Sequence, residues 1–191
     1  MKNGEIIMEN ERKETKDKYK IFADELLKWN KTHKLTNYNK EDILNQINDS
    51  LYPLEYIKDA KSAIDVGTGA GFPGLILAAA MPNTKWYLVE PLKKRYSFLN
   101  YIKMLLELKN VEIIPERIEN SNLEQADLIT SRAVMKTRDF LDLIKPYIKN
   151  NGTILLYKGS NVLDELNGIN AKIINNKNRN YVFIKAQQWE K

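Results

Sequence analysis

The stretch 62–80, SAIDVGTGAGFPGLILAAA, constrains the fold more than any other part of the chain. A short apolar run at 63–66 leads directly into a cluster of glycines, and an apolar, alanine-rich segment of helical character follows. Glycine allows sharp turns and a close approach of the backbone to a ligand, and the first turn of a helix presents N–H groups without intrahelical partners. A strand, a glycine turn and a helix start in this order indicate a nucleotide-cofactor site.

Two classes of cofactor fit this loop to different degrees. Residues 69–74, GAGFPG, match the dinucleotide pattern G-x-G-x-x-G, but in that pattern the first glycine ends the strand, and here Gly67 and Thr68 intervene. Read from the strand end, Asp65 precedes a G-x-G-x-G run, which is typical of enzymes that bind S-adenosylmethionine. An acid suits the cationic end of that molecule and would repel a pyrophosphate. The loop therefore favours S-adenosylmethionine over NAD.

Strand-like and helix-like segments alternate along the rest of the chain. Apolar runs predict strands at 63–66, 86–89, 111–114, 127–130, 153–157, 171–174 and 181–184, and a helical apolar stripe covers 91–108. This alternation predicts a mostly parallel sheet covered by helices on both faces. Right-handed crossovers place the cofactor at the carboxyl ends of the strands.

The first third of the chain has a different character. Residues 1–60 predict a small helical appendage packed on a main domain that spans 61–191. A helical apolar pattern starts at Lys18, and a second follows Asn39, a plausible N-cap with acids in the next turn. Residues 1–16 are polar and lack periodicity, so we expect them to fray.

Composition limits the chemistry. The chain has no cysteine and one histidine, so we expect no disulfide, no thiolate nucleophile and no metal site. We find neither a signal peptide nor a run of about 18 apolar residues, and we expect a cytoplasmic protein that does not enter a membrane. The net charge is +5, and the basic excess falls in residues 131–191. Such asymmetry indicates a face for a polyanion such as nucleic acid, or a basic surface that serves solubility.

Polar residues follow the expected strands. Glu90 ends the second strand, where an acid can accept both ribose hydroxyls of an adenosine; NAD enzymes share this feature, so it does not choose the cofactor. The segment 116–119 after the third strand is placed to flank the adenine. Residues 130–134, TSRAV, follow the fourth strand and face the transferable methyl group. Arg132 there ends a buried strand, and a buried arginine needs an anionic or polar partner.

The same segment restricts the methyl acceptor. Enzymes that methylate exocyclic amines of bases usually carry an Asn/Asp-Pro-Pro-aromatic motif at this point, and methylation of a pyrimidine carbon needs a thiolate; the sequence has neither. A ring nitrogen with an in-plane lone pair, such as nitrogen-7 of a purine, needs only alignment and a cationic methyl donor. Methyl transfer to a small molecule stays open on these grounds.

A series of motifs resembles one known family. The chain carries, in order, DVGTGAGFPG (65–74), LVEPLKKR (88–95), ERIEN (116–120), SRAV (131–134), LYKG (156–159) and RNYVFIKA (179–186), preceded by Trp29-Asn30-Lys31, Leu35-Thr36 and Asp49-Ser50-Leu51. Together they resemble the bacterial RsmG (GidB) family, whose members methylate nitrogen-7 of a guanosine in small-subunit (16S) ribosomal RNA. The resemblance runs from about Leu26 to Lys185. Two positions depart from the family pattern, Lys34 in place of an asparagine and Gln46 in place of a histidine.

The resemblance implies a Rossmann-like class I S-adenosylmethionine-dependent methyltransferase with a seven-stranded sheet. Cofactor contacts are expected from Asp65, Gly67, Thr68, Gly69, Gly71, Phe72, Glu90, Ile118, Glu119 and Arg132. RNA contacts are expected from Lys93, Lys94, Arg95, Arg132 and Lys158. Arg132 and Lys158 would position the guanosine, and no residue is assigned a certain catalytic role.

The expected partner is small-subunit ribosomal RNA, free or in the assembled subunit, and the expected state is a monomer. Two other functions remain open at this point. A nicotinamide-dependent reductase would use the same sheet and the same ribose acid. A non-catalytic ribosome-assembly factor would bind RNA beside a vestigial pocket.

Overall fold

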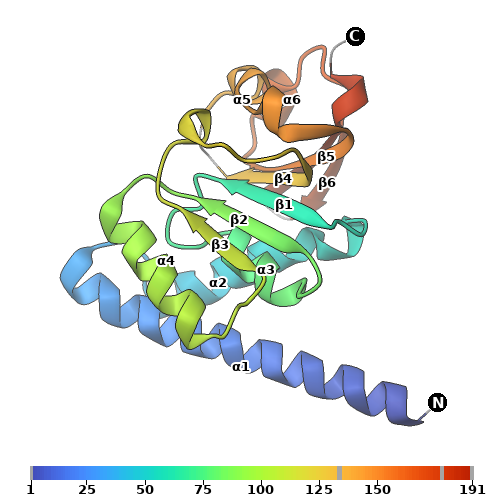
Figure 1. The fold of residues 1–191 in the computed structure, drawn as a ribbon. Coiled ribbons are helices and arrows are strands. Elements are labelled where there is room, and N and C mark those ends of the chain that lie inside the picture. Colours follow the sequence, from blue (N-terminus) through green and yellow to red (C-terminus); the bar gives the residue numbers. More distant parts are fainter. Residues whose placement is uncertain (1, 133–134, 177–178, 190–191) are drawn as a thin grey trace.

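The computed structural model describes residues 2–132, 135–176 and 179–189, with side chains from residue 13 onward (Figure 1). Its centre is a seven-stranded sheet of order β3-β2-β1-β4-β5-β7-β6. The strands are β1 (Ser62–Val66), β2 (Lys85–Val89), β3 (Val111–Ile114), β4 (Ala126–Arg132), β5 (Ile148–Lys158), β6 (Lys172–Asn176) and β7 (Arg179–Lys185). Strands β1 to β5 pair in parallel, and β7 pairs antiparallel with both β5 and β6. The mostly parallel, Rossmann-like class I sheet expected from the sequence is confirmed.

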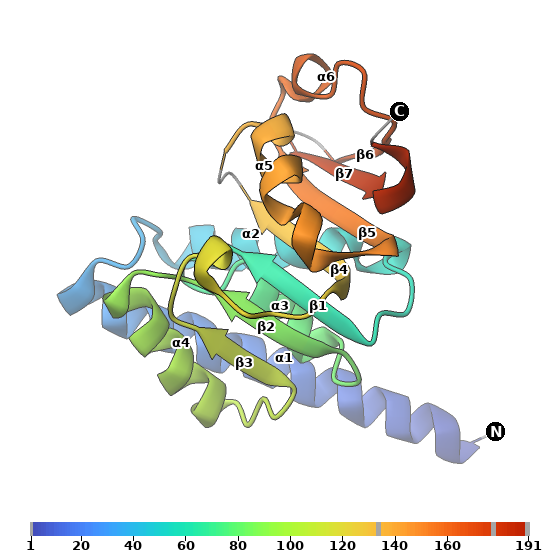
Figure 2. The same ribbon diagram turned by 45° about the horizontal axis from the view of Figure 1, so that its top comes forward.

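Helices cover both faces of this sheet. They are α1 (Lys2–His33), α2 (Lys40–Leu51), α3 (Gly74–Ala80), α4 (Lys93–Leu105), α5 (Thr137–Ile144) and α6 (Val162–Glu165). Apolar side chains of α1 to α4 form one core with one face of the sheet, whereas α5 and α6 pack on the other face. Figures 1 and 2 show this division, with α1, α2 and α3 together on the side opposite α5. In the part of the chain that the structure describes, no helix is long and apolar enough to cross a membrane.

The first helix is longer than its apolar pattern predicts. The expectation that residues 1–16 fray is wrong, because α1 runs from Lys2 to His33. Its first half is rich in glutamate, lysine and arginine, which have high helix propensity. Within it, Glu14 and Lys18 form an ion pair of 2.8 Å one turn apart.

The two N-terminal helices share the core of the sheet. Phe22 on α1 is fully buried, and its ring lies 5.3 Å from the ring of Phe72 in the glycine loop. Helix α2 begins after Asn39, whose side chain accepts a hydrogen bond from the backbone N–H of Asp42, while the Asp42 carboxylate accepts one from the backbone N–H of Asn39. This capping box matches the predicted cap. The helices of residues 1–60 therefore bring side chains directly to the sheet, next to the glycine loop.

Candidate functional site

A cavity of about 760 Å³ opens at the carboxyl ends of β1, β2 and β4. Its wall includes most of the glycine loop, the end of β2, the turn 117–119 and the end of β4. Three further residues come from the connection between α1 and α2: Leu35, Thr36 and Tyr38. In an open parallel sheet this edge is where ligands bind. The cavity lies where the order of the strands predicts the cofactor.

The glycine loop owes its path to left-handed backbone angles. Gly67, Gly69 and Gly71 have φ of 72°, 62° and 108°, values that favour glycine. The N–H groups of Gly67 and Thr68 both donate to the carbonyl of Val89, at 3.0 and 3.1 Å, which fastens the loop to the end of β2.

Two of these glycines serve different purposes. A Cβ placed on Gly69 would meet nothing within 4 Å, and Gly69 lines the cavity, so its bare backbone leaves room for a ligand. A Cβ on Gly71 would lie 3.2 Å from the Cβ of Leu75 and 3.4 Å from Phe22. Gly71 does not line the cavity, and the structure places it in the packing between loop and helices.

Asp65 lies behind the loop instead of facing the cavity. It is fully buried. Its carboxylate accepts hydrogen bonds from the backbone N–H of Gly74 at 2.9 Å and from the hydroxyl of Thr130 at 2.7 Å. Burial raises the pKa of Asp65 even though these hydrogen bonds oppose the shift. The prediction that this acid meets the cationic end of the ligand is corrected: it joins the start of α3 to β1 and β4.

Glu90 at the end of β2 is hydrogen-bonded to the glycine loop on the side that faces the cavity. One carboxylate oxygen accepts the N–H of Gly69 at 3.0 Å, and the other accepts the N–H of Leu92 at 2.9 Å. The side chain is nearly buried, yet it lines the cavity. Each carboxylate oxygen has a second lone pair, so Glu90 is fixed by the backbone and still has acceptor capacity toward a ligand.

The basic cluster at the start of α4 divides into two groups. Arg95 lines the cavity, where one of its terminal nitrogens lies 3.6 Å from Glu90. Its Nε is buried and has no hydrogen-bond partner among the residues that the structure describes. Lys93 and Lys94 are exposed and do not line the cavity, and the Lys94 ammonium donates to the carbonyl of Lys34 at 3.2 Å. Arg95 therefore belongs to the cavity, and the two lysines belong to the surface beside it.

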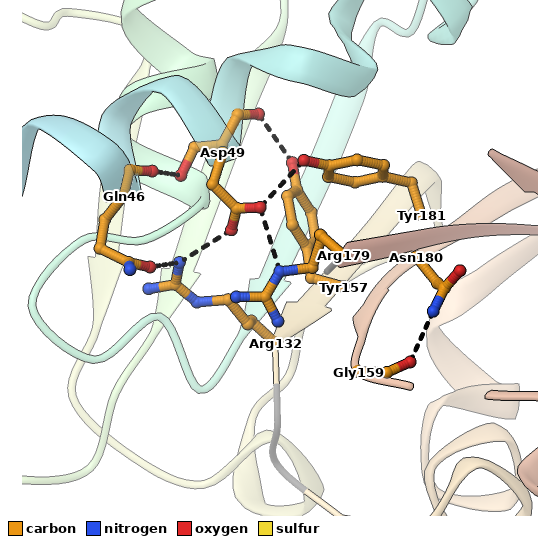
Figure 3. A network of polar contacts seen from close by, with 9 residues as sticks. Gln46, Asp49, Arg132, Tyr157, Gly159, Arg179, Asn180 and Tyr181 are labelled. Atoms are coloured by element: carbon orange, nitrogen blue, oxygen red, sulfur yellow. Dashed lines mark hydrogen bonds and ion pairs between the residues drawn. The ribbon is translucent and has the colours of Figure 1, made fainter. Parts of the chain in front are cut away.

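Arg132 lines the cavity at the end of β4, and Figure 3 shows its contacts with Gln46 and Asp49 on α2. Its side chain is 12% exposed, and its Nη1 donates to the Gln46 amide oxygen at 2.5 Å and lies 3.5 Å from Asp49. The guanidinium also lies 5.2 Å from the centre of the Phe72 ring. Gln46, one of the two departures from the family pattern, thus contacts the predicted substrate arginine directly.

Asp49 on α2 connects three elements of the fold. One of its carboxylate oxygens accepts hydrogen bonds from Arg179 Nε at 3.0 Å and from the Tyr181 hydroxyl at 2.9 Å, both on β7, while the other faces Arg132 on β4 (Figure 3). Burial together with the Asp49 charge raises the pKa of Tyr181. Sequence reasoning assigned Asp49 no role. The sequence feature that could have indicated such a role is the Asp49-Ser50 pair, which is one of the motifs that carry the family resemblance.

Lys158 is not part of the cavity. Its side chain is 10% exposed, and its ammonium donates to Glu165 at 2.6 Å and to the Met135 carbonyl at 3.5 Å. The hydrogen bond from Lys158 lowers the pKa of Glu165. The ammonium is engaged with α6 and the segment after β4, so a role of Lys158 in positioning a guanosine stays a prediction.

Of the remaining predicted residues, two line the cavity and two lie outside the part of the chain that the structure describes. Ile118 is buried and Glu119 exposed, and both line the cavity after β3. Ala133 and Val134 of the predicted methyl-facing segment lie outside the described residues. Thr36 and Asp139 line the cavity without having been predicted. Thr36 is held by Asn30, which accepts its N–H at 3.0 Å and donates to its hydroxyl at 2.9 Å.

Comparison with known proteins agrees with this geometry. The family model described as "rRNA small subunit methyltransferase G" (GidB) matches residues 15–190. The "Ribosomal RNA small subunit methyltransferase G" of Campylobacter curvus (strain 525.92) is 46% identical over 168 residues, which are 87% of this chain and 89% of the relative. The protein of the same description from Helicobacter pylori (strain ATCC 700392 / 26695) is 47% identical over 147 residues, which are 76% of this chain and 83% of the relative.

Solved structures share the fold at low sequence identity. A SAM-dependent methyltransferase from Aquifex aeolicus superposes with a TM-score of 0.61 at 20% identity, covering 73% of this chain and 90% of that one. A putative S-adenosyl-L-methionine-dependent methyltransferase from Methanococcus maripaludis gives 0.60 at 18% identity, covering 85% and 91%. At these identities the likeness shows the fold.

Proposed function

Because the chain belongs to the rRNA small subunit methyltransferase G (GidB) family, we propose that it transfers the methyl group of S-adenosylmethionine to nitrogen-7 of a guanosine in small-subunit (16S) ribosomal RNA. The observation that supports this most directly is the cavity at the carboxyl edge of the sheet. There the glycine loop and Glu90 line one space together with Arg132.

The loop side suits the methyl donor. S-adenosylmethionine supplies, when bound, a methyl group made electrophilic by a positively charged sulfur. Glu90 accepts the ribose hydroxyls, because its carboxylate is fixed by two backbone N–H groups and retains lone pairs. The open space at Gly69 admits the donor close to the backbone. Ile118 and Glu119 flank the adenine.

The Arg132 side suits the acceptor. Nitrogen-7 of guanine has an in-plane lone pair and no proton to lose, so its bond to the methyl carbon forms without a general base. Arg132 offers a guanidinium that pairs well with a phosphate of the target nucleotide. The base must leave its stack to enter the cavity, which costs on the order of a few kcal/mol that protein contacts offset. In this proposal, the protein aligns the reacting atoms and takes no proton from the acceptor.

The substrate proposal includes both free small-subunit RNA and the assembled subunit, acted on by a monomer. The two alternatives from sequence analysis are not favoured by the family membership. A titration with NADH tests the reductase directly, because the proposed function predicts that NADH does not compete with S-adenosylmethionine at comparable concentration. The assembly factor predicts RNA binding without methyl transfer.

The test is a transfer assay on defined subunits. Small subunits from a strain that lacks this gene are incubated with the purified protein and labelled S-adenosylmethionine, and the modified base is mapped. We expect label at nitrogen-7 of one guanosine of the RNA. The matched control is Gly67→Arg, which fills the donor side of the cavity at a residue of φ 72° and should abolish both donor binding and transfer. Label on another atom, or none, would refute the proposal.

A further inference from the structure

The basic excess of residues 131–191 is not explained by the cavity described above. A second cavity of about 560 Å³ opens elsewhere, bounded by the segment 56–60, the start of β4, the start of β6 and the end of β7. Because β7 runs antiparallel to β5, its end lies at the amino edge of the parallel strands. Strand β4 links the two sites, with Asp127 at this cavity and Arg132 at the first one. At about 3.3 Å per residue, they lie about 17 Å apart across the sheet.

Three lysines line this second cavity. Lys58 and Lys172 are exposed, and Lys185 is half-buried at the end of β7. The Lys185 ammonium donates to the Thr153 hydroxyl at 2.5 Å. Burial and the nearby charge of Lys58 lower the pKa of Lys185. Lys58 and Lys185 therefore repel each other, and an anion placed between them would relieve that repulsion.

The acids nearby do not cancel this charge. Asp127 accepts hydrogen bonds from the backbone N–H groups of Lys61 and Ser62, at 2.9 and 3.0 Å, and pairs with the Lys149 ammonium at 2.8 Å. These donors lower the pKa of Asp127 against the effect of burial. Since Lys149 neutralises Asp127, the three lysines that line the cavity still outnumber the other two acids, Asp59 in the lining and the neighbouring Glu55, whose side chain is hydrogen-bonded to Tyr56.

The cavity also carries groups that suit a nucleotide. Amides of Asn151, Asn170 and Gln188 line it and can donate to phosphate oxygens. Tyr56 is 38% exposed, its ring packs edge-on against Phe183, and the Lys172 ammonium lies 5.2 Å from the ring centre. Lysine side chains beside an exposed aromatic ring are a recurring combination in proteins that bind single-stranded nucleic acid.

We propose that this lysine cavity binds a backbone phosphate of the substrate RNA, as a second contact apart from the methyl-transfer cavity. The proposal rests on the proposed function, which makes RNA the substrate. It accounts for the placement of Lys172 and Lys185, which belong to the basic C-terminal third. Inorganic phosphate carries the same charged oxygens as a backbone phosphate of RNA, so the experiment tests binding of free phosphate and of RNA separately.

The test compares two variants of equal charge change. Lys58→Gln/Lys172→Gln removes the two exposed lysines of the cavity, and Lys31→Gln/Lys109→Gln removes two exposed lysines that line neither cavity. Binding of a small-subunit RNA fragment is measured over a range of salt concentrations. We expect the first variant to bind about 5-fold to 10-fold more weakly and its salt slope to fall by about 0.7 to 0.9 per lost phosphate contact. For the control variant, we expect the loss of RNA affinity and the fall in salt slope each to stay below about a third of these values.

A donor-binding measurement and a phosphate titration complete the design. Both variants should bind S-adenosylmethionine as the unmodified protein does, since the lysine cavity lies at the other edge of the sheet. Equal RNA affinity and salt slope in the cavity variant and the control would overturn the proposal. The same holds if millimolar inorganic phosphate binds the unmodified protein but not the cavity variant while RNA affinity is unchanged. If RNA binding depends on the lysine cavity but the unmodified protein transfers no methyl group, the proposed function is refuted and the lysine cavity is still supported.

Discussion

The two walls of the methyl-transfer cavity are built in different ways. The donor wall consists of the glycine loop and Glu90, which come from neighbouring segments of the chain and are joined through backbone N–H groups. The acceptor wall consists of Arg132, which is held by side chains of Gln46 and Asp49, more than 80 positions earlier in the chain. One wall is a local backbone structure, and the other exists only after α2 has packed on the sheet.

This difference predicts that the two walls fail separately. Loss of a donor-wall group should weaken binding of S-adenosylmethionine, because the proposed function places the donor against the loop and Glu90. Loss of an acceptor-wall support should spare donor binding and lower the rate of transfer, because the guanidinium of Arg132 is left without its fixed position. The experiments below test this separation in order of expected effect.

The largest effect is expected for Glu90→Ala. The change removes the proposed ribose acceptor and leaves the N–H groups of Gly69 and Leu92 without their partner. A hydrogen bond between a ribose hydroxyl and a carboxylate contributes about 1.5–3 kcal/mol, and Glu90 is proposed to make two, so we expect affinity for S-adenosylmethionine to fall by about 100-fold or more, measured by calorimetry. Glu116→Ala, an exposed acid outside the cavity, is the control and should leave affinity unchanged. A dissociation constant within about twofold of the unmodified value would contradict the assignment of Glu90.

A smaller effect, of another kind, is expected for Asp49→Asn. The neutral amide keeps one oxygen but loses the charge that faces Arg132 and Arg179. We expect kcat for methyl transfer to fall by about 10-fold, a barrier increase of about 1.4 kcal/mol, with donor affinity unchanged. Asp24→Asn, which breaks an exposed ion pair to Lys40 of 3.7 Å, serves as the matched control. If donor affinity falls together with kcat, the two walls are coupled and the separation proposed here is wrong.

The sequence predicts the donor wall better than the acceptor wall for a physical reason. A glycine loop after a strand and an acid after the next strand are short-range patterns, so the positions of Gly69 and Glu90 follow from local structure and strand order. The partners of Arg132 depend on how α2 packs, which no local pattern encodes. Asp65 on β1 shows a limit even next to the loop, because its spacing fits a ligand contact while its buried carboxylate is hydrogen-bonded to Gly74 and Thr130.

Lys158 illustrates the same limit, because a basic residue after a strand near the cavity gave no sign of its acidic partner. Glu165 lies on α6, a short helix that sequence analysis did not predict. The length of α1 was missed because sequence analysis looked for an apolar stripe, whereas the first turns are rich in residues of high helix propensity. In contrast, all seven expected strands are present in one sheet.

The smallest effect is expected for Glu165→Gln, which tests whether Lys158 belongs to the acceptor wall. Lys158 holds the folded-state pKa of Glu165 below its usual value of 4.5, so this carboxylate stabilises the fold above about pH 4.5, and the stabilisation disappears as pH falls through the lowered pKa. The Glu165 side chain is 36% exposed, so we expect a loss of about 1 kcal/mol or less at pH 7.

Urea unfolding at several pH values provides the measurement. The difference in unfolding free energy between the unmodified protein and Glu165→Gln should be constant above about pH 5 and should shrink toward pH 3. Methyl transfer at pH 7 should stay within about twofold of the unmodified rate, because the Lys158 ammonium lies outside the cavity. A larger fall in transfer without a loss of stability would place Lys158 beside Arg132 in acceptor binding. The acceptor wall would then include β5, and its assembly would depend on the face of the sheet that carries α6 as well as on α2.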